Sequence, residues 1–194
     1  MGLRDILTGR HAVKGPAPDR MFAISTAYVT LESAHQIAPA GKAAIVFQAL
    51  ATSEFEATLK EMEEVVTATG GESGTTVATQ DDSYGYRWMV MSNPTGAPSV
   101  EDLAVAINAV SGSIETAGHG ERLLCAVFAF ADAQSHPIYF IYNYKRGYWY
   151  PFVPAPGDQQ RSTERELQIK AQIGEELPIE PEIERWFPLW GIPI

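Results

Sequence analysis

The residues best suited to binding chemistry are two adjacent cations inside an otherwise apolar, aromatic-rich run. Residues 138–154 read IYFIYNYKRGYWYPFVP, and Lys145 and Arg146 stand immediately before Gly147. A run this apolar belongs inside a fold. Its turn must therefore either carry the two cations out to solvent or place them at the edge of an aromatic floor, where they would hold an anionic partner.

The second of these alternatives defines a candidate binding site. Arg presents a planar fork of N–H donors that matches carboxylate or phosphate, and nearby Tyr hydroxyls can add further hydrogen bonds. The candidate residues for a ligand or a partner are Tyr144, Lys145, Arg146, Tyr148 and Trp149. The alternative to this binding role is that Arg146 pairs internally with an acid such as Glu164 or Glu166.

The other reactive side chains form no recognisable catalytic arrangement. The adjacent acids Asp81 and Asp82 fall in a turn, where carboxylates are solvated and keep ordinary pKa values. Cys125 stands among apolar residues, which is typical of a buried, inert thiol. The four histidines are scattered, and the chain has no glycine-rich phosphate loop and no nucleophile elbow. We therefore expect no catalytic residues, no metal site and no cofactor.

Composition narrows the class of protein. The 194 residues carry a net charge of −10, which argues against nucleic-acid binding because that relies on clustered Lys and Arg. The single cysteine excludes an intrachain disulfide and fits a reducing compartment. No apolar run approaches the roughly 20 residues that span a bilayer, and the first residues lack the apolar core of a signal peptide. We expect a cytoplasmic protein.

The N-terminal segment differs from the rest of the chain in charge. Residues 1–20 carry +2, and the remainder carries −12. Residues 2–8 can form a short amphipathic helix, and the HAVKGPAP sequence after it is typical of a linker. Such a basic terminus can make a weak contact with a membrane or a partner, through Leu3, Arg4, Ile6, Leu7 and Arg10. The alternative is a terminal helix that simply docks on the body of the protein.

Hydrophobic patterning predicts an α+β fold with a predominantly antiparallel sheet, in which residues 1–19 form the helix and linker and residues 20–194 form one domain. Helices are predicted to begin at Ser53 and Ser99, and a third at residues 163–173. Short turns between consecutive strands favour antiparallel pairing. The strands are predicted at residues 27–33, 41–50, 75–79, 84–91, 123–131, 137–144 and 148–153. Three strand–strand–helix units indicate an internal repeat.

Two details of this pattern concern surfaces. Tyr84, Tyr86 and Trp88 alternate along one predicted strand and should share a face. The last residues, 176–194, read ELPIEPEIERWFPLWGIPI, and Ile183, Trp186 and Phe187 are predicted to face inward. This tail either packs across the core or inserts into a groove of a partner.

Five stretches of the chain resemble the PspAB proteins, which are associated with phage shock protein A in actinobacteria and some archaea. They are MGLRDILTGR, DSYGYRWMV, LLCAVFAF, YNYKRGYWYPFVP and ELQIKAQIGEELPIEPEIERWFPLWGIP. The resemblance spans nearly the whole chain and is densest from Leu123 onward. These stretches are family signatures and contain no catalytic motif.

The resemblance implies a context for the protein. Phage shock protein A is a coiled-coil protein that binds stressed inner-leaflet membrane, and its small associates accompany or modulate it. We expect a non-enzymatic cytoplasmic accessory of this stress response, which binds phage shock protein A or an associated protein at the inner face of the cell membrane. The alternative is a small-molecule binding protein or enzyme that holds an anionic ligand in an aromatic pocket with Arg146.

Overall fold

A six-stranded antiparallel sheet organises the molecule. The computed structural model describes residues 18–70, 75–92 and 99–194. The strand order is β2-β3-β1-β4-β5-β6, and every neighbouring pair is antiparallel, which confirms the predicted α+β class. The strands are β1 (Ala38–Phe47), β2 (Thr76–Asp81), β3 (Arg87–Ser92), β4 (Leu123–Ala131), β5 (Pro137–Asn143) and β6 (Tyr148–Phe152), with a small separate pair, β7 (Pro154–Ala155) and β8 (Gln160–Arg161).

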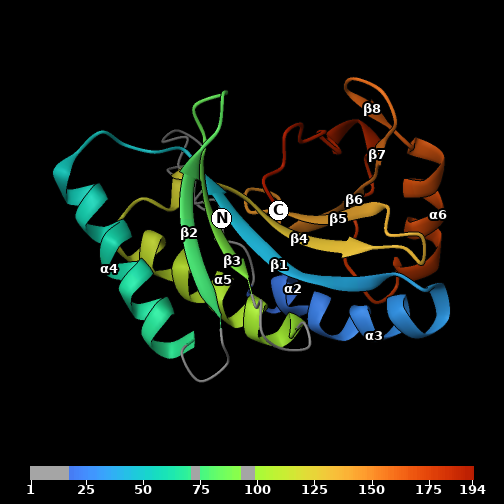
Figure 1. Cartoon of the computed structure of the whole chain (residues 1–194), viewed down its shortest axis with the longest axis horizontal. Coiled ribbons are helices and arrows are strands. Elements are labelled where there is room, and N and C mark those ends of the chain that lie inside the picture. The colour runs from blue at the N-terminus through green and yellow to red at the C-terminus, as the bar shows by residue number, and fades with distance from the viewer. Residues whose placement is uncertain (1–17, 71–74, 93–98) are drawn as a thin grey trace, which may run out of the picture.

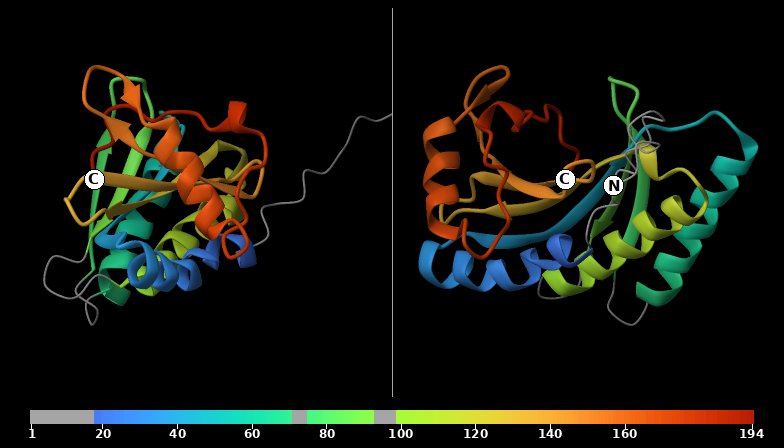
Figure 2. Two further views of the ribbon diagram at one scale, coloured as in Figure 1. Left: turned by 90° about the vertical axis from the view of Figure 1, so that its right-hand side faces the viewer. Right: turned by 180° about the vertical axis from the view of Figure 1, so that it is seen from behind.

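Helices cover one face of this sheet, and the C-terminal segment crosses the other (Figures 1 and 2). The helical layer contains α2 (Pro18–Phe22), α3 (Ile24–His35), α4 (Ser53–Gly70) and α5 (Val100–Thr116). Helix α6 (Thr163–Ile173) packs beside β6, at the opposite end of the sheet from α4. Two single turns of 3-10 helix, η1 (Gly120–Arg122) and η2 (Ile183–Arg185), complete the structure.

The long helices form where the apolar spacing predicts them. In α5, Ser99 caps the first turn because its hydroxyl accepts a hydrogen bond from the N–H of Asp102 at 3.0 Å. The apolar residues that repeat at helical spacing in α4 and α5 are all buried: Phe55, Leu59, Met62, Val66, Leu103, Ile107, Val110 and Ile114. Helix α4 begins at Ser53 as predicted, and the Thr52 hydroxyl accepts a hydrogen bond from the N–H of Phe55 in its first turn.

The predicted strand at residues 27–33 is wrong, because these residues belong to α3. The stretch alternates like a strand, but Ile24, Ala27 and Leu31 also repeat at helical spacing, and these three side chains are the ones buried. Packing against the sheet decides between the two periods and leaves Val29 exposed. The first of the three predicted strand–strand–helix units therefore does not exist. Strand β1 instead pairs with β3 and β4 from later in the chain.

The C-terminal segment packs across the open face of the sheet, as predicted for a tail that covers the core. The hydroxyl of Tyr150 donates to the carbonyl of Phe187 at 3.1 Å, and that of Tyr139 donates to the carbonyl of Ile194 at 3.1 Å. Trp186 is buried. However, the prediction that Ile183 and Phe187 also face inward is wrong, since they are 40% and 59% exposed.

Candidate functional site

The β5–β6 turn displays the two cations that the sequence singles out. Asn143 organises this turn: its side-chain oxygen accepts from the backbone N–H groups of Lys145 at 3.0 Å and Arg146 at 3.2 Å. Its carbonyl accepts from the N–H of Gly147 at 2.8 Å. Gly147 has a φ of +68°, a conformation that glycine adopts without steric penalty. The turn is therefore fixed by local hydrogen bonds, and its two cationic side chains leave in different directions.

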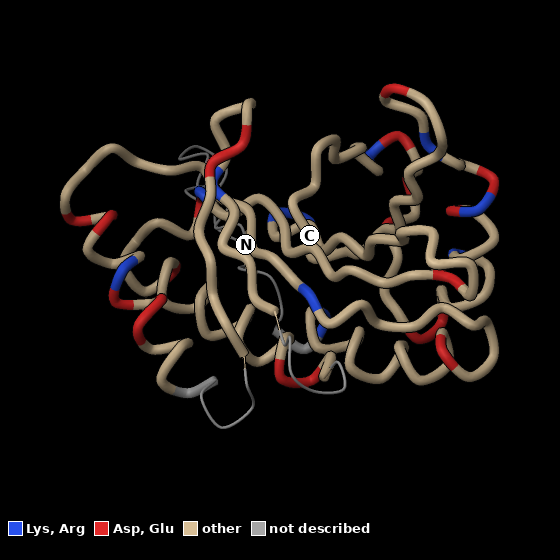
Figure 3. The backbone as a smooth tube through the Cα atoms, viewed as in Figure 1, with Lys and Arg blue, Asp and Glu red and all other residues tan. Residues whose placement is uncertain are grey.

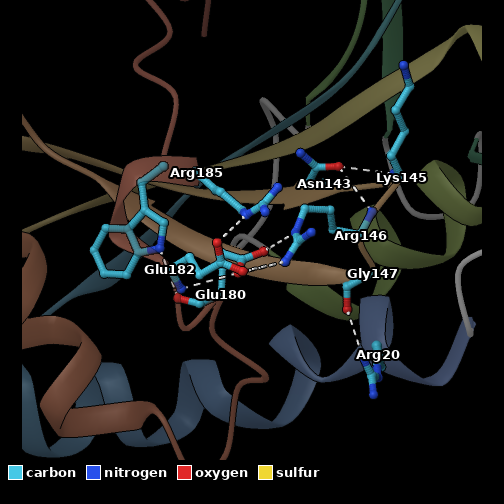
Figure 4. Close-up of polar contacts among 9 residues, drawn as sticks. Arg20, Asn143, Lys145, Arg146, Gly147, Glu180, Glu182 and Arg185 are labelled. Atoms are coloured by element: carbon cyan, nitrogen blue, oxygen red, sulfur yellow. Dashed lines mark hydrogen bonds and ion pairs between the residues drawn. The ribbon is translucent and has the colours of Figure 1, made fainter.

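The guanidinium of Arg146 is held by acids of the C-terminal segment (Figure 4). Its Nε donates to one carboxylate oxygen of Glu180, and its Nη2 donates to the other at 3.1 Å. Glu182 lies at 3.5 Å from the same Nη2. Internal pairing, one of the two alternatives from the sequence, is thus what the structure shows. The predicted partners Glu164 and Glu166 are not used: Glu166 is fully buried and pairs with Arg161 at 2.6 Å.

This pair changes the acidity of Glu180. Burial by itself would raise the pKa of the carboxyl group, whose side chain is only 3% exposed. The hydrogen bonds from Arg146 and from the N–H of Glu182, together with the charges of Arg146 and Arg185, outweigh that effect and hold the pKa of Glu180 below its ordinary value. Glu180 is therefore a carboxylate that anchors the tail to the turn at neutral pH.

Lys145 points away from this cluster (Figure 4). Its side chain is exposed, and none of the described residues makes an ion pair or a hydrogen bond with its ammonium group. Of the two cations in the turn, Lys145 is consequently the one whose charge is available to a ligand or a partner.

The three aromatic residues of the candidate site are mostly structural. Trp149 is fully buried, and its indole N–H donates to the carbonyl of Arg20 at 2.7 Å. Tyr144 is also buried, and burial raises the pKa of its hydroxyl. Tyr148 is half-buried, with the Arg20 guanidinium 4.8 Å from its ring centre. In this conformation Tyr148 can contact another molecule, whereas Tyr144 and Trp149 contact the core.

Arg20 connects the turn to the beginning of the described chain. Besides its contact with Tyr148, it donates from Nη1 to the carbonyl of Gly147 at 3.4 Å. Helix α2 begins at Pro18, so residues 1–17 join the described chain next to this turn. The candidate N-terminal contact residues lie outside the described residues: Leu3, Arg4, Ile6, Leu7 and Arg10.

A pocket of about 500 Å³ lies on the sheet face opposite the helices, and residue spacing alone does not reveal it. Its floor includes Val46, Trp88 and Cys125, which occupy one row across β3, β1 and β4. The turn before β3 provides one wall, and residues 187–190 of the C-terminal segment provide another. Lys145 and Asn143 belong to its lining, whereas Arg146 does not.

Tyr84, Tyr86 and Trp88 were expected on one strand face, and all three line this pocket. The predicted strand boundary is wrong, since β3 begins at Arg87 and the two tyrosines lie in the turn before it. Their position depends on Asp82. One of its carboxylate oxygens accepts from the N–H groups of Tyr84 and Tyr86 at 2.8 and 2.9 Å, and the other accepts from the indole N–H of Trp88 at 2.9 Å.

The other reactive groups of this region have structural roles. Asp81 accepts from Arg87 at 2.6 Å, and this hydrogen bond lowers the pKa of Asp81. Burial raises the pKa of the Cys125 thiol to about 12, so it stays protonated at neutral pH and is a poor nucleophile. Within the described ranges, no three His, Cys, Asp or Glu side chains gather as a metal site would require.

Comparison with known proteins places the chain in a family. The family model described as PspA associated protein B matches residues 1–194, which is the whole chain. The chain belongs to the PspAB family. No curated protein and no solved structure matches it. The resemblance seen in the sequence is thereby confirmed, and the family name links the protein to phage shock protein A.

Net negative charge in this PspAB protein lies mainly on the helical layer, most visibly along α4 (Figure 3). Helices α3, α4 and α5 contain nine acidic residues and a single lysine: Glu32, Glu54, Glu56, Glu61, Glu63, Glu64, Glu101, Asp102, Glu115 and Lys60. That layer would be repelled by an anionic surface. In the part of the chain that the structure describes, no helix combines the length and apolarity needed to cross a membrane.

Proposed function

We propose that the protein is a cytoplasmic accessory of the phage shock response that binds phage shock protein A or a protein associated with it. The observation that carries this proposal is the match of the PspA associated protein B family to the entire chain. A binding role also agrees with the chemistry of the molecule. Asp81 and Asp82 hold Arg87 and a turn, and Cys125 is a buried thiol, so the candidate reactive groups are already engaged in structure.

The surface that we propose for this contact is the end of the molecule where the β5–β6 turn meets α2. Lys145 is exposed there without a partner among the described residues, and the guanidinium of Arg20 lies over the ring of Tyr148 at the start of β6. The basic residues 1–17 are attached at the same place. Since the helical layer is acidic, a partner that is itself bound to anionic lipid would be approached more favourably from this end.

The direct test is recovery of the partner from cells. The tagged protein is purified after reversible cross-linking, with and without membrane stress, and phage shock protein A is quantified in the eluate. We expect enrichment above a tag-only control under stress. The surface is tested by Lys145→Glu, which should reduce recovery of phage shock protein A. The matched charge reversal Lys60→Glu, on α4, should leave that recovery unchanged. Recovery at background level from stressed cells would contradict the proposed function.

The structure does not support the alternative function, in which Arg146 holds an anionic ligand. The guanidinium is occupied by Glu180 and lies outside the pocket lining.

A further inference from the structure

The pocket between the β2–β3 turn and the C-terminal segment has the dimensions of a small-molecule site. Its volume of about 500 Å³ lies within the range of roughly 300–1,000 Å³ that is typical of such sites. Its floor residues Val46, Trp88 and Cys125 are at most 7% exposed, so the bottom of the pocket is apolar and well packed. Binding sites of this kind combine an apolar body with a few polar groups that fix the orientation of the ligand.

The walls of the pocket are aromatic and partly open to solvent. Tyr84 and Tyr86 are 60% and 39% exposed on one side, and Phe187 is 59% exposed on the other, next to Trp190. These residues come from segments about a hundred positions apart, and both segments are held in place by hydrogen bonds: the turn by Asp82, and the tail by Tyr150. The result is a preformed gap between rings whose exposed apolar surface a ligand would cover.

The polar groups left free at the pocket favour an anion. Asp82 is the acid of the lining, but both of its oxygens already accept hydrogen bonds, three in all. The side-chain oxygen of Asn143 accepts from two backbone N–H groups, which leaves its NH2 group as the part available to a ligand. The ammonium of Lys145 has no partner among the described residues. Lys145 and Asn143 therefore offer donors, and Lys145 is the cation of the lining. Asp82 keeps its negative charge because its three donors are neutral, but it lies in the turn before β3, and its oxygens are occupied.

We infer that this pocket binds a small amphipathic anion, with its apolar body between Tyr84, Tyr86 and Phe187 and a carboxylate facing Lys145 and the amide of Asn143. The apolar body provides most of the affinity, because the lysine is exposed and its ion pair with a ligand is screened by solvent. The lysine provides selectivity for the sign of the head group. This site shares Lys145 with the proposed protein contact, but ligand binding requires no partner and is tested on the purified protein alone.

Two sources of such a ligand share this chemistry, a single-chain fatty acid and a planar aromatic acid. The full-length protein is titrated by calorimetry with decanoate and with 2-naphthoate, each below the concentration at which it aggregates. Decanol and decyltrimethylammonium serve as neutral and cationic controls. We expect at least one of the acids to saturate a single site, the neutral compound to bind a few-fold more weakly, and the cationic compound to bind about tenfold more weakly. Saturation by decanoate alone assigns an acyl chain, and by 2-naphthoate alone a planar ring.

Variants locate the binding. Lys145→Glu should weaken binding of the acid about tenfold, since it replaces attraction with repulsion, and leave binding of decanol unchanged. The matched reversal Lys60→Glu, on the exposed face of α4, should leave binding of the acid and of decanol unchanged. Phe187→Ala should weaken binding of acid and alcohol alike, because it removes a wall that both contact. All three residues are exposed, and circular dichroism with thermal melting checks that each variant folds.

Two results would overturn the inference. The first is that neither acid saturates a site, or that the alcohol or the ammonium compound binds as tightly as the acids. The second is that Lys145→Glu and Lys60→Glu behave alike, which would place the bound anion elsewhere on the molecule. Because these titrations use the purified protein alone, their outcome is independent of whether phage shock protein A is recovered from cells.

Discussion

Arg146 and Glu180 join the β5–β6 turn to the C-terminal segment through a two-pronged ion pair across 34 positions of sequence. The acid is almost completely buried, with 3% of its side chain exposed, and the guanidinium is 32% exposed. Nearby, the carbonyl of Glu180 accepts from the indole N–H of Trp186 at 3.0 Å. The pair therefore fixes the point at which the tail begins to cross the sheet, and with it one wall of the pocket.

Arg146→Met should lower the free energy of unfolding by clearly more than its matched control does, because it leaves the Glu180 carboxylate buried without its cation. The matched control is Arg185→Met. Arg185 pairs with Glu182 at 2.7 Å, but both side chains are about half exposed, so its loss should change the free energy of unfolding by less than about 0.5 kcal/mol. Urea unfolding monitored by tryptophan fluorescence measures the free energy of unfolding of both variants. Equal effects of the two substitutions would mean that the Arg146–Glu180 pair contributes no more than a surface contact.

The same pair should make stability fall on acidification. The pKa of Glu180 is lowered by folding, and in the unfolded chain it returns to its ordinary value of 4.5. A group with a depressed folded-state pKa stabilises the protein fully above its unfolded pKa, and this contribution is lost as the pH falls through the folded-state value. The free energy of unfolding should therefore decrease below about pH 4.5.

A comparison of variants isolates this contribution. Asp81 and Asp132 also have lowered pKa values and lose stabilisation over the same range, but they do so equally in the wild type and in Arg146→Met. In that variant, burial without a cation should raise the pKa of Glu180, so acidification from about pH 6 to about pH 4 should cost it less stability than the wild type. An identical loss in the two proteins, measured by urea unfolding at each pH, would assign the acid sensitivity to other groups.

The sequence predicts elements that carry a single strong period and misses contacts between distant segments. Residues 123–131 form β4 with the predicted bounds, since the run is apolar and ends in a polar turn. Residues 27–33 fit both the strand period and the helix period, and they are helical because the helix buries Ala27 and Leu31. No local pattern identifies Glu180 as the partner of Arg146, because any of several acids could reach it.

The pocket could not be predicted for the same reason. Its walls come from the turn before β3 and from residues 187–190, and only the folded sheet brings them together. One local signal was present: Tyr84, Tyr86 and Trp88 alternate, and they do line one side of the pocket. The sequence predicts Asp82 to be one of two solvated acids in a turn. Its hydrogen bonds to these three residues depend on the geometry of the turn, which residue spacing does not specify.

Cys125 should be unreactive in the native protein. Burial raises the pKa of its thiol to about 12, so at about pH 8 only a very small fraction is thiolate, and the side chain is 7% exposed. A disulfide reagent such as dithionitrobenzoate should modify it slowly in buffer and rapidly in denaturing urea. Rapid native modification would show that the pocket floor opens readily, and protection by decanoate would then indicate that the ligand covers it.

Removal of residues 1–15 should leave folding nearly unchanged and weaken association with the partner or with anionic vesicles. The described chain begins at Pro18, and the sequence predicts a proline-containing linker before it. The segment combines Leu3, Ile6 and Leu7 with Arg4 and Arg10, and a few apolar side chains at about 1.5–3 kcal/mol each, less the entropy of ordering them, support only weak and reversible attachment.

The effect of this truncation should be larger at low salt, because the Debye length is longer and the remainder of the molecule carries −12. Sedimentation with vesicles of one fixed anionic lipid content, at two salt concentrations, measures the loss of binding. The control is Arg4→Gln with Arg10→Gln, which keeps the apolar residues and should lose only the salt-dependent part. A clear drop in melting temperature on truncation, with vesicle and partner binding unchanged, would instead show that residues 1–15 stabilise the body of the protein and make no external contact.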